Sequence, residues 1–203
     1  MKTVGVLALQ GDFAAHCKAV ERAGGHAIEV RTSGDLARCD GLIIPGGEST
    51  TILKLLEGDE LKKCIKSYSS TNSIYGSCAG IILLAKEVSH PSQESLDVLD
   101  VGIERNAYGR QIDSSVAMIQ PTEGPAMEAV FIRAPIIRRV GPQVRVLATH
   151  MGDPVWIEHG RHMATTFHPE LTSDLRVHRH FLALLEQSGS SSKVRPGEAD
   201  KLT

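Results

Sequence analysis

Cys78 stands between two glycines, at the junction of two apolar segments. The stretch Gly76-Ser77-Cys78-Ala79-Gly80 has the G-x-nucleophile-x-G form of a tight strand-to-helix corner, with cysteine as the nucleophile. The dipole and free N–H groups at the start of the following helix favour a thiolate, and the Ala79 N–H can donate to an oxyanion. The pattern predicts a catalytic cysteine, although a small buried residue at a tight turn would also satisfy it.

His168 and Glu170 supply the acid–base partners that a cysteine nucleophile needs. They lie two residues apart at the end of an expected strand, where residues two apart project to the same side. A carboxylate that faces the imidazole would orient it and stabilise its charged form. We therefore expect a triad of Cys78, His168 and Glu170, and we interpret the other eight of the nine histidines as structural.

The loop Pro45-Gly46-Gly47-Glu48 follows another expected strand and can provide a second oxyanion donor. Two consecutive glycines let a peptide N–H point into a site, or flip between orientations, without steric cost. We expect the isolated chain to leave this oxyanion hole incomplete. A phosphate-binding loop is the competing interpretation, but neither G-x-x-x-x-G-K-[ST] nor G-x-G-x-x-G occurs here. A flexible turn without a catalytic role is the other alternative.

These three segments together specify acyl transfer from an amide or an ester. Cys78 would attack the carbonyl carbon, and His168 would carry the proton while Glu170 holds its ring. Backbone N–H groups would take the developing negative charge. The sequence shows no metal-ligand spacing, and we expect neither a metal nor another cofactor.

Strands that alternate with helices must position the three loops. In an open parallel sheet, ligand sites lie beyond the carboxyl ends of the strands, which is where the three loops fall. We predict an α/β fold with an open, mostly parallel sheet, flanked by helices on both faces and with some antiparallel excursions. The expected strands are 3–9, 26–30, 42–44, 73–75, 116–119, 130–132, 144–148, 155–158 and 163–167, and the expected helices are 12–23, one from about 49, 79–86 and 173–185.

The length and composition of the chain limit the class of protein to which it can belong. Its 203 residues, 41% of them hydrophobic, suffice for one sizeable core. With a formal net charge of -2, the chain has no excess of positive charge of the kind that binds nucleic acid or an anionic membrane. No apolar run approaches the ~20 residues that span a bilayer, and no signal peptide is evident, so we expect a cytoplasmic protein. We expect one domain over 1–187 and a disordered polar tail over 188–203.

The three catalytic segments resemble those of the class I, triad-type glutamine amidotransferases. Four further segments narrow the resemblance to the glutaminase subunit of pyridoxal 5'-phosphate synthase: 5–11 (GVLALQG), 41–51, 104–111 (ERNAYGRQ) and 131–135 (FIRAP). The resemblance covers about residues 4–185. It implies hydrolysis of L-glutamine to L-glutamate and ammonia, and transfer of the ammonia through a tunnel to a (β/α)8-barrel synthase subunit.

The same resemblance implies roles for individual residues. Gly47 and Ala79 match oxyanion-hole positions, and Gln10 falls in a loop that senses the partner subunit. Arg105 and Glu48 carry charges suited to the two charged groups of a free amino acid, and the sequence leaves open which group each one contacts. The residues that match substrate-binding positions are Gly46, Gly47, Glu48, Ser49, Arg105, Ile132 and Arg133.

Three other functions stay open at this point. A cysteine-dependent hydrolase or deglycase of the same architecture also uses a cysteine corner, but it does not predict His168 and Glu170 two residues apart. A catalytically inactive docking module would keep the fold without needing all three triad residues. A glutaminase that serves another synthase, such as one for histidine, is excluded only by the segments specific to the pyridoxal phosphate subunit.

Overall fold

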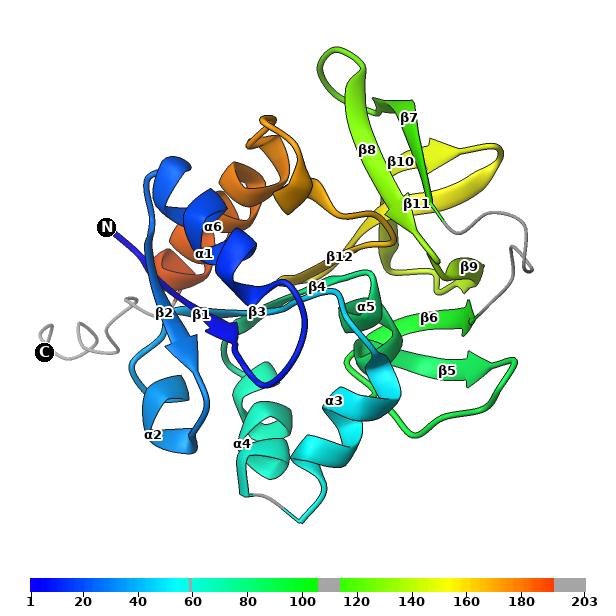
Figure 1. The fold of residues 1–203 in the computed structure, drawn as a ribbon. Helices are drawn as coiled ribbons and strands as arrows, with labels where there is room; N and C mark the ends of the chain where they lie inside the picture. Colours follow the sequence, from blue (N-terminus) through cyan, green and yellow to red (C-terminus); the bar gives the residue numbers. More distant parts are fainter. Residues whose placement is uncertain (59, 106–113, 192–203) are drawn as a thin grey trace, which may run out of the picture.

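The computed structural model describes residues 1–58, 60–105 and 114–191, which form one nine-stranded sheet and a smaller one (Figure 1). The order of the large sheet is β2-β1-β3-β4-β12-β11-β10-β7-β8. Among these described strands, the first five run parallel and the rest pair antiparallel. The strands are β1 (Thr3–Leu7), β2 (His26–Val30), β3 (Gly41–Ile44), β4 (Ser73–Ser77), β7 (Ser114–Pro121), β8 (Met127–Ile132), β10 (Val144–His150), β11 (Asp153–His159) and β12 (His162–Thr165).

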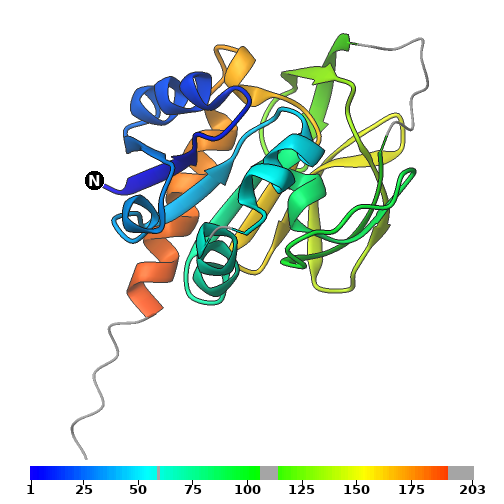
Figure 2. The same cartoon turned by 60° about the horizontal axis from the view of Figure 1, so that its bottom comes forward.

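Helices cover both faces of the parallel part of the sheet, as the two views show (Figures 1 and 2). One face carries α1 and α6, and the other carries α3, α4 and α5. The predicted fold class is therefore confirmed, with a larger antiparallel part than the sequence suggested. The helices are α1 (Phe13–Arg22), α2 (Ser33–Leu36), α3 (Ser49–Leu56), α4 (Glu60–Ser69), α5 (Ala79–Leu84) and α6 (Arg176–Ser191), with a 3₁₀ turn η2 (Pro169–Leu171).

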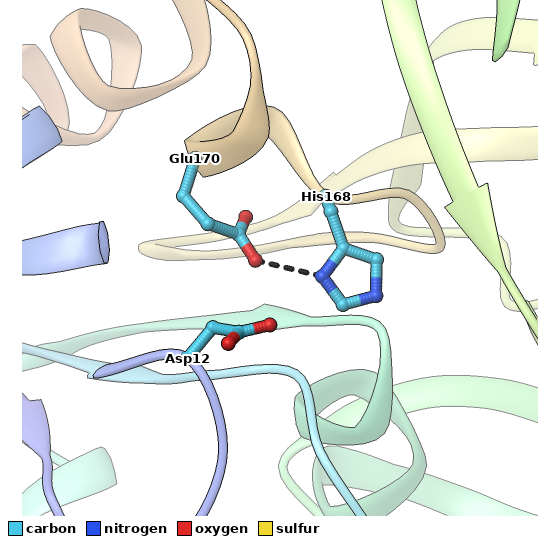
Figure 3. Close-up of side chains that lie close together, drawn as sticks. All are labelled: Asp12, His168 and Glu170. Atoms are coloured by element: carbon cyan, nitrogen blue, oxygen red, sulfur yellow. Dashed lines mark hydrogen bonds and ion pairs between the residues drawn. The ribbon is translucent and has the colours of Figure 1, made fainter. Parts of the chain in front are cut away.

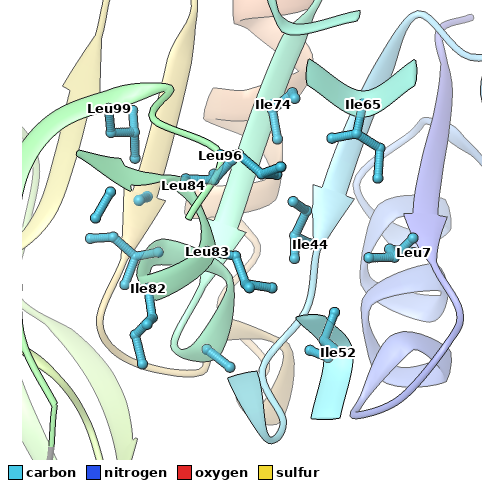
Figure 4. Close-up of a cluster of buried hydrophobic side chains, with 14 of the residues drawn as sticks. Leu7, Ile44, Ile52, Ile65, Ile74, Ile82, Leu83, Leu84, Leu96 and Leu99 are labelled. Carbon is cyan, nitrogen blue, oxygen red and sulfur yellow. The ribbon is translucent and has the colours of Figure 1, made fainter. Parts of the chain in front are cut away.

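Alternate side chains of the central strands enter two separate cores. Leu42 and Ile44 of β3 belong to the core beneath α3, α4 and α5, part of which Figure 4 shows. Ile43 points to the other face and joins the core beneath α1 and α6. In register, Ile44 pairs with Gly76 of β4, and Thr165 of β12 pairs with Ser77. The carboxyl ends of these three strands therefore lie side by side, as the predicted site requires.

A second, three-stranded sheet was not predicted. It has the order β5-β6-β9 and consists of β5 (Ala85–Ser89), β6 (Leu99–Glu104) and β9 (Ile136–Val140). The prediction that a helix covers 79–86 is wrong at its end, because β5 already begins at Ala85. The carbonyl groups of Leu83 and Leu84 accept from the N–H groups of Leu96 and Val98, so a tertiary pairing ends α5 despite the helix-forming residues that follow.

The C-terminal helix is longer than predicted. We expected it to end at 185 and a disordered tail to begin at 188, whereas α6 runs to Ser191. The Ser188 hydroxyl donates to the Leu184 carbonyl oxygen, one turn earlier in the helix. The rest of the predicted tail, 192–203, lies outside the described residues. No helix in the described part of the chain has the length and apolar composition that a membrane crossing requires.

Candidate active site

Cys78 occupies the sharp corner between β4 and α5. Its backbone adopts φ 49° and ψ -102°, which is strained for a residue other than glycine, and α5 begins at the next residue. A Cβ on Gly76 would lie 2.7 Å from the Gly80 carbonyl carbon, and a Cβ on Gly80 would overlap the Ile44 carbonyl oxygen. The flanking glycines therefore let α5 lie directly against β3 and β4, as the sequence predicted.

His168 and Glu170 are in contact (Figure 3). His168 Nδ1 lies 2.7 Å from Glu170 Oε1, and both residues are buried. The backbone between them forms the 3₁₀ turn η2, because β12 already ends at Thr165. The expected contact is thus present, but a 3₁₀ turn rather than extended backbone brings the two side chains together, and the strand expected over 163–167 ends at Thr165.

The environment of His168 favours the charged imidazole. Burial disfavours the charge, but the hydrogen bonds and negative charges of Cys78 and Glu170 outweigh burial and raise the pKa of His168 to about 10. Burial also opposes the charge of Glu170, yet His16 and His168 hold its pKa below the usual range. At neutral pH a protonated His168 therefore lies beside an ionised Glu170, ready to give a proton to a leaving group.

A cavity of about 230 Å³ opens in front of Cys78 and His168. Gly46 and Glu170 do not line it. Gly46 lies against the imidazole, and Glu170 lies behind it. The structure thus brings most of the predicted binding residues to one place. The predicted residues in the lining, besides Cys78 and His168, are Gln10, Gly47, Glu48, Ser49, Ala79, Arg105, Ile132 and Arg133.

Glu48 and Arg105 present opposite charges to this cavity. Arg105 Nη2 lies 3.5 Å from Glu48 Oε1, and the Thr50 hydroxyl donates to the same oxygen at 3.0 Å. Arg105 is buried, which strengthens its interaction with any anion that enters. The rest of the RNAYGRQ motif, 106–111, lies outside the described residues.

The diglycine loop is tied to the segment before α1. Gln10 Oε1 accepts from the Glu48 N–H at 2.7 Å, and the Gly46 carbonyl oxygen accepts from the Asp12 N–H at 3.2 Å. Gln10, predicted to sense a partner, therefore contacts the loop expected to donate to the oxyanion. Our expectation that this oxyanion hole is incomplete in the isolated chain stays a prediction.

Ile132 and Arg133 bring backbone to the thiol. Cys78 Sγ lies 3.7 Å from the Ile132 carbonyl oxygen. Arg133 has φ 43°, a left-handed conformation that turns the chain sharply after β8. This turn places the Ile132 carbonyl group beside Cys78, and the backbone contacts to substrate that the resemblance implies for Ile132 and Arg133 stay a prediction.

Two residues near the triad were not singled out from the sequence. Asp12 adds a carboxylate, and one ligand atom from each of Asp12, His168 and Glu170 lies within 4.8 Å of the others, close enough to share a metal ion (Figure 3). The expectation that no metal takes part stays a prediction. His16 was interpreted as structural, and this is incomplete, because its Nε2 lies 3.2 Å from Glu170 Oε2. No spacing rule could have found it, since the partner is far along the chain.

Known proteins match the chain over nearly its whole length. The profile of the SNO glutamine amidotransferase family matches residues 6–187. Pyridoxal 5'-phosphate synthase subunit PdxT of Solibacter usitatus is 54% identical over 192 residues, covering 91% of this chain and 100% of the relative. The protein of the same name from Koribacter versatilis is 48% identical, covering 94% and 99%. A crystal structure of a glutamine amidotransferase superposes with a TM-score of 0.85 at 45% identity, covering 90% of this chain and 98% of that chain.

Proposed function

Because the chain belongs to the SNO glutamine amidotransferase family, we propose that it hydrolyses the side-chain amide of L-glutamine to L-glutamate and ammonia. One observation carries this proposal. A single cavity brings Cys78 and His168 together with the Glu48–Arg105 pair. A nucleophile with its proton donor thus faces one cation and one anion, which are the partners that a free amino acid needs.

The first half of the reaction forms a thioester. The Cys78 thiolate attacks the amide carbon, and the N–H groups of Gly47 and Ala79 hold the resulting oxyanion. The protonated His168 gives its proton to the nitrogen, the carbon–nitrogen bond breaks, and ammonia leaves. Glu170 keeps the His168 ring in the orientation that this transfer requires.

The second half of the reaction releases glutamate. His168, now neutral, takes a proton from a water molecule as the water oxygen attacks the thioester carbon. The carbon–sulfur bond then breaks, so Cys78 returns as a thiolate while His168 has regained its proton. The starting charges of Cys78 and His168 are restored, and the new carboxyl group of the product gives its proton to solvent to become the carboxylate of glutamate.

Substrate recognition follows from charge. Arg105 binds the α-carboxylate group of glutamine, and Glu48 binds its α-ammonium group. Arg105 and Glu48, whose charged groups lie 3.5 Å apart, exchange this contact for contacts with the substrate. The remaining binding positions, which shape the cavity through backbone and a hydroxyl group, are Gly46, Gly47, Ser49, Ile132 and Arg133.

The ammonia goes to a synthase partner. The relatives that are 54% and 48% identical are named pyridoxal 5'-phosphate synthase subunits, which supports a (β/α)8-barrel synthase subunit as the partner. The same names argue against a histidine synthase, a deglycase or an inactive docking module as the function of this chain. In this proposal, residues 1–187 form the glutaminase domain, and the protein acts in the cytoplasm. The contact between Gln10 and the Glu48 N–H offers a route by which docking can adjust the diglycine loop.

The test is the release of ammonia from L-glutamine, with and without the barrel subunit, with Cys78→Ala as the blank. We expect release that rises when the partner is added and is absent from the variant. Ammonia release that does not change when the barrel subunit is added would indicate a glutaminase that serves another synthase. No release under either condition would contradict the proposed activity.

A further inference from the structure

A buried row of two histidines continues from the triad carboxylate into the core. Glu170 uses Oε1 for His168, and its Oε2 faces His16 Nε2 at 3.2 Å. His16 Nδ1 in turn lies 3.1 Å from His178 Nε2. His16 comes from α1 and His178 from α6, and their exposed fractions are 0% and 1%. The row therefore joins the site to two helices on the α1–α6 face of the sheet.

The hydrogen-bonding pattern of the row has one consistent assignment. Burial lowers the pKa of His16 and lowers that of His178 to about 3, so both rings are neutral at pH 7. A neutral imidazole has one donor nitrogen and one acceptor nitrogen. His16 Nε2 makes no aligned hydrogen bond among the described residues, but it lies 3.2 Å from Glu170 Oε2, where an N–H is attracted to the carboxylate and a bare ring nitrogen would be repelled by it. We therefore assign the proton of His16 to Nε2. His16 Nδ1 is then the acceptor and takes the Nε2 proton of His178.

Glu170 depends on this donor because little else reaches its second oxygen. Ser77 Oγ lies 3.5 Å from Oε2, at the limit of a hydrogen bond, and also lies 3.3 Å from the Phe167 carbonyl oxygen. The terminal torsion of a glutamate side chain is broad, so a carboxylate held at one oxygen can rotate. Burial without donors also favours the protonated, neutral form. Either change weakens the support of Glu170 for the charged His168.

We propose that His16, oriented by His178, is a positioning residue that fixes the Glu170 carboxylate for its work on His168. The inference rests on the proposed function, since positioning matters only for the reaction that the triad performs. His16 touches neither substrate nor the reacting atoms. Besides His168, the other charged or titratable groups that interact with this row among the described residues are Asp12, Arg22 and Tyr75.

Two substitutions at one position separate positioning from packing. His16→Leu keeps the bulk and removes the donor, whereas the side-chain amide of His16→Gln can place an N–H near the site of the imidazole Nε2. In the complex with the barrel subunit, we expect His16→Leu to lower kcat by about 10- to 100-fold with KM within about 3-fold, and the acid limb of kcat/KM to move to higher pH. We expect His16→Gln to restore kcat to within about 5-fold and to restore the pH profile.

His162→Leu is the matched control. His162 is a histidine of comparable burial at the opposite end of β12, where its Nδ1 accepts from the Ile74 N–H. The same substitution there should leave kcat per folded molecule and the pH profile unchanged. A loss of kcat in His16→Leu with an unmoved acid limb, or the same losses in His162→Leu, would reduce the row to a structural role and overturn the inference.

Nitrogen NMR of the imidazoles tests the inference without substrate. Long-range ¹H–¹⁵N spectra of the free wild-type chain should show His16 and His178 as Nε2–H tautomers, and His168 should lose its proton at lower pH in His16→Leu than in the wild type. An Nδ1–H tautomer at His16, or an unmoved His168 titration, would overturn the inference even if His16→Leu folds poorly and only His16→Gln can be assayed. If these spectra agree but glutamine is not hydrolysed, it is the proposed function that fails.

Discussion

At the scale of single residues, the backbone of Gly46 packs closely against the His168 imidazole, in addition to the contact that His168 makes with Glu170. A Cβ on Gly46 would overlap Cε1 of the ring. We expect Gly46→Ala to lower kcat by about 100-fold, because a displacement of about 1 Å of a catalytic group costs this much. The measurement is kcat alongside the melting temperature, which should fall by only a few degrees.

Gly34→Ala serves as the control for this substitution. The nearest atom to a Cβ there is Thr32 Oγ1 at 3.7 Å, so nothing has to move. Its kcat should equal that of the wild type. A Gly46→Ala enzyme with kcat within about threefold of the wild type would show that the imidazole has room to shift without loss.

Residue types and short spacings made the triad predictable. The residues that contact the triad from distant parts of the sequence could not be predicted in this way. Cys78 is marked by its glycines, and His168 and Glu170 are marked by each other. Arg105 could be identified only through a resemblance, since a single arginine carries no signal of its own. His16 and Asp12 meet the triad only after α1 has packed beside the 3₁₀ turn, and no local pattern encodes that contact.

At the scale of secondary-structure elements, the distance between α5 and β3 is set by one glycine. Alanine is better than glycine inside a helix by about 1 kcal/mol, so propensity alone predicts that Gly80→Ala stabilises the protein. Its Cβ would, however, overlap the Ile44 carbonyl oxygen, which is backbone of the middle strand in the parallel part of the sheet. We expect the clash to win and urea denaturation to give a free energy of unfolding lower by about 1–3 kcal/mol. A variant more stable than the wild type would contradict this.

The elements with a regular apolar pattern could be predicted, and those defined by tertiary pairing could not. β2 and the start of α3 lie where expected, because the diglycine before His26 and the glycine-to-serine loop before α3 mark them locally. The chain at Ala85 continues a helical pattern in sequence, yet it pairs with Leu99 and becomes β5. The strands of the small sheet stabilise one another across long loops, so no one of them is recognisable alone.

At the scale of the whole molecule, three buried histidines should make the fold sensitive to acid. Burial lowers the pKa of His178 to about 3, that of His162 to about 4, and that of His16 by an amount that keeps it neutral at pH 7. Histidine in the unfolded chain has a pKa of about 6.5, so below that pH the unfolded chain binds protons that these histidines do not bind in the native state. This stability is present above pH 6.5 and is lost as the pH falls toward 4 and 3.

Urea denaturation between pH 6.5 and 5 measures this effect. Each such histidine contributes a slope of up to about 1.4 kcal/mol per pH unit. His162→Leu should be less stable than the wild type at pH 7 and should lose stability less steeply on acidification, because it has one such proton fewer. Parallel pH dependences for the two proteins would show that His162 is already charged in the native state.

The position of β12 has a consequence for the making of the protein. It lies in the middle of the large sheet, between β4 and β11, although it is the last strand of the described chain. A growing chain that has not yet released residues 162–165 from the ribosome therefore carries Cys78 on a sheet that stops at an unpaired β4 edge. His168 and Glu170 follow only after this strand is synthesised. A ribosome-bound fragment that lacks β12 and the residues after it therefore cannot hydrolyse glutamine. Ammonia release begins only after β12 has taken its place between β4 and β11.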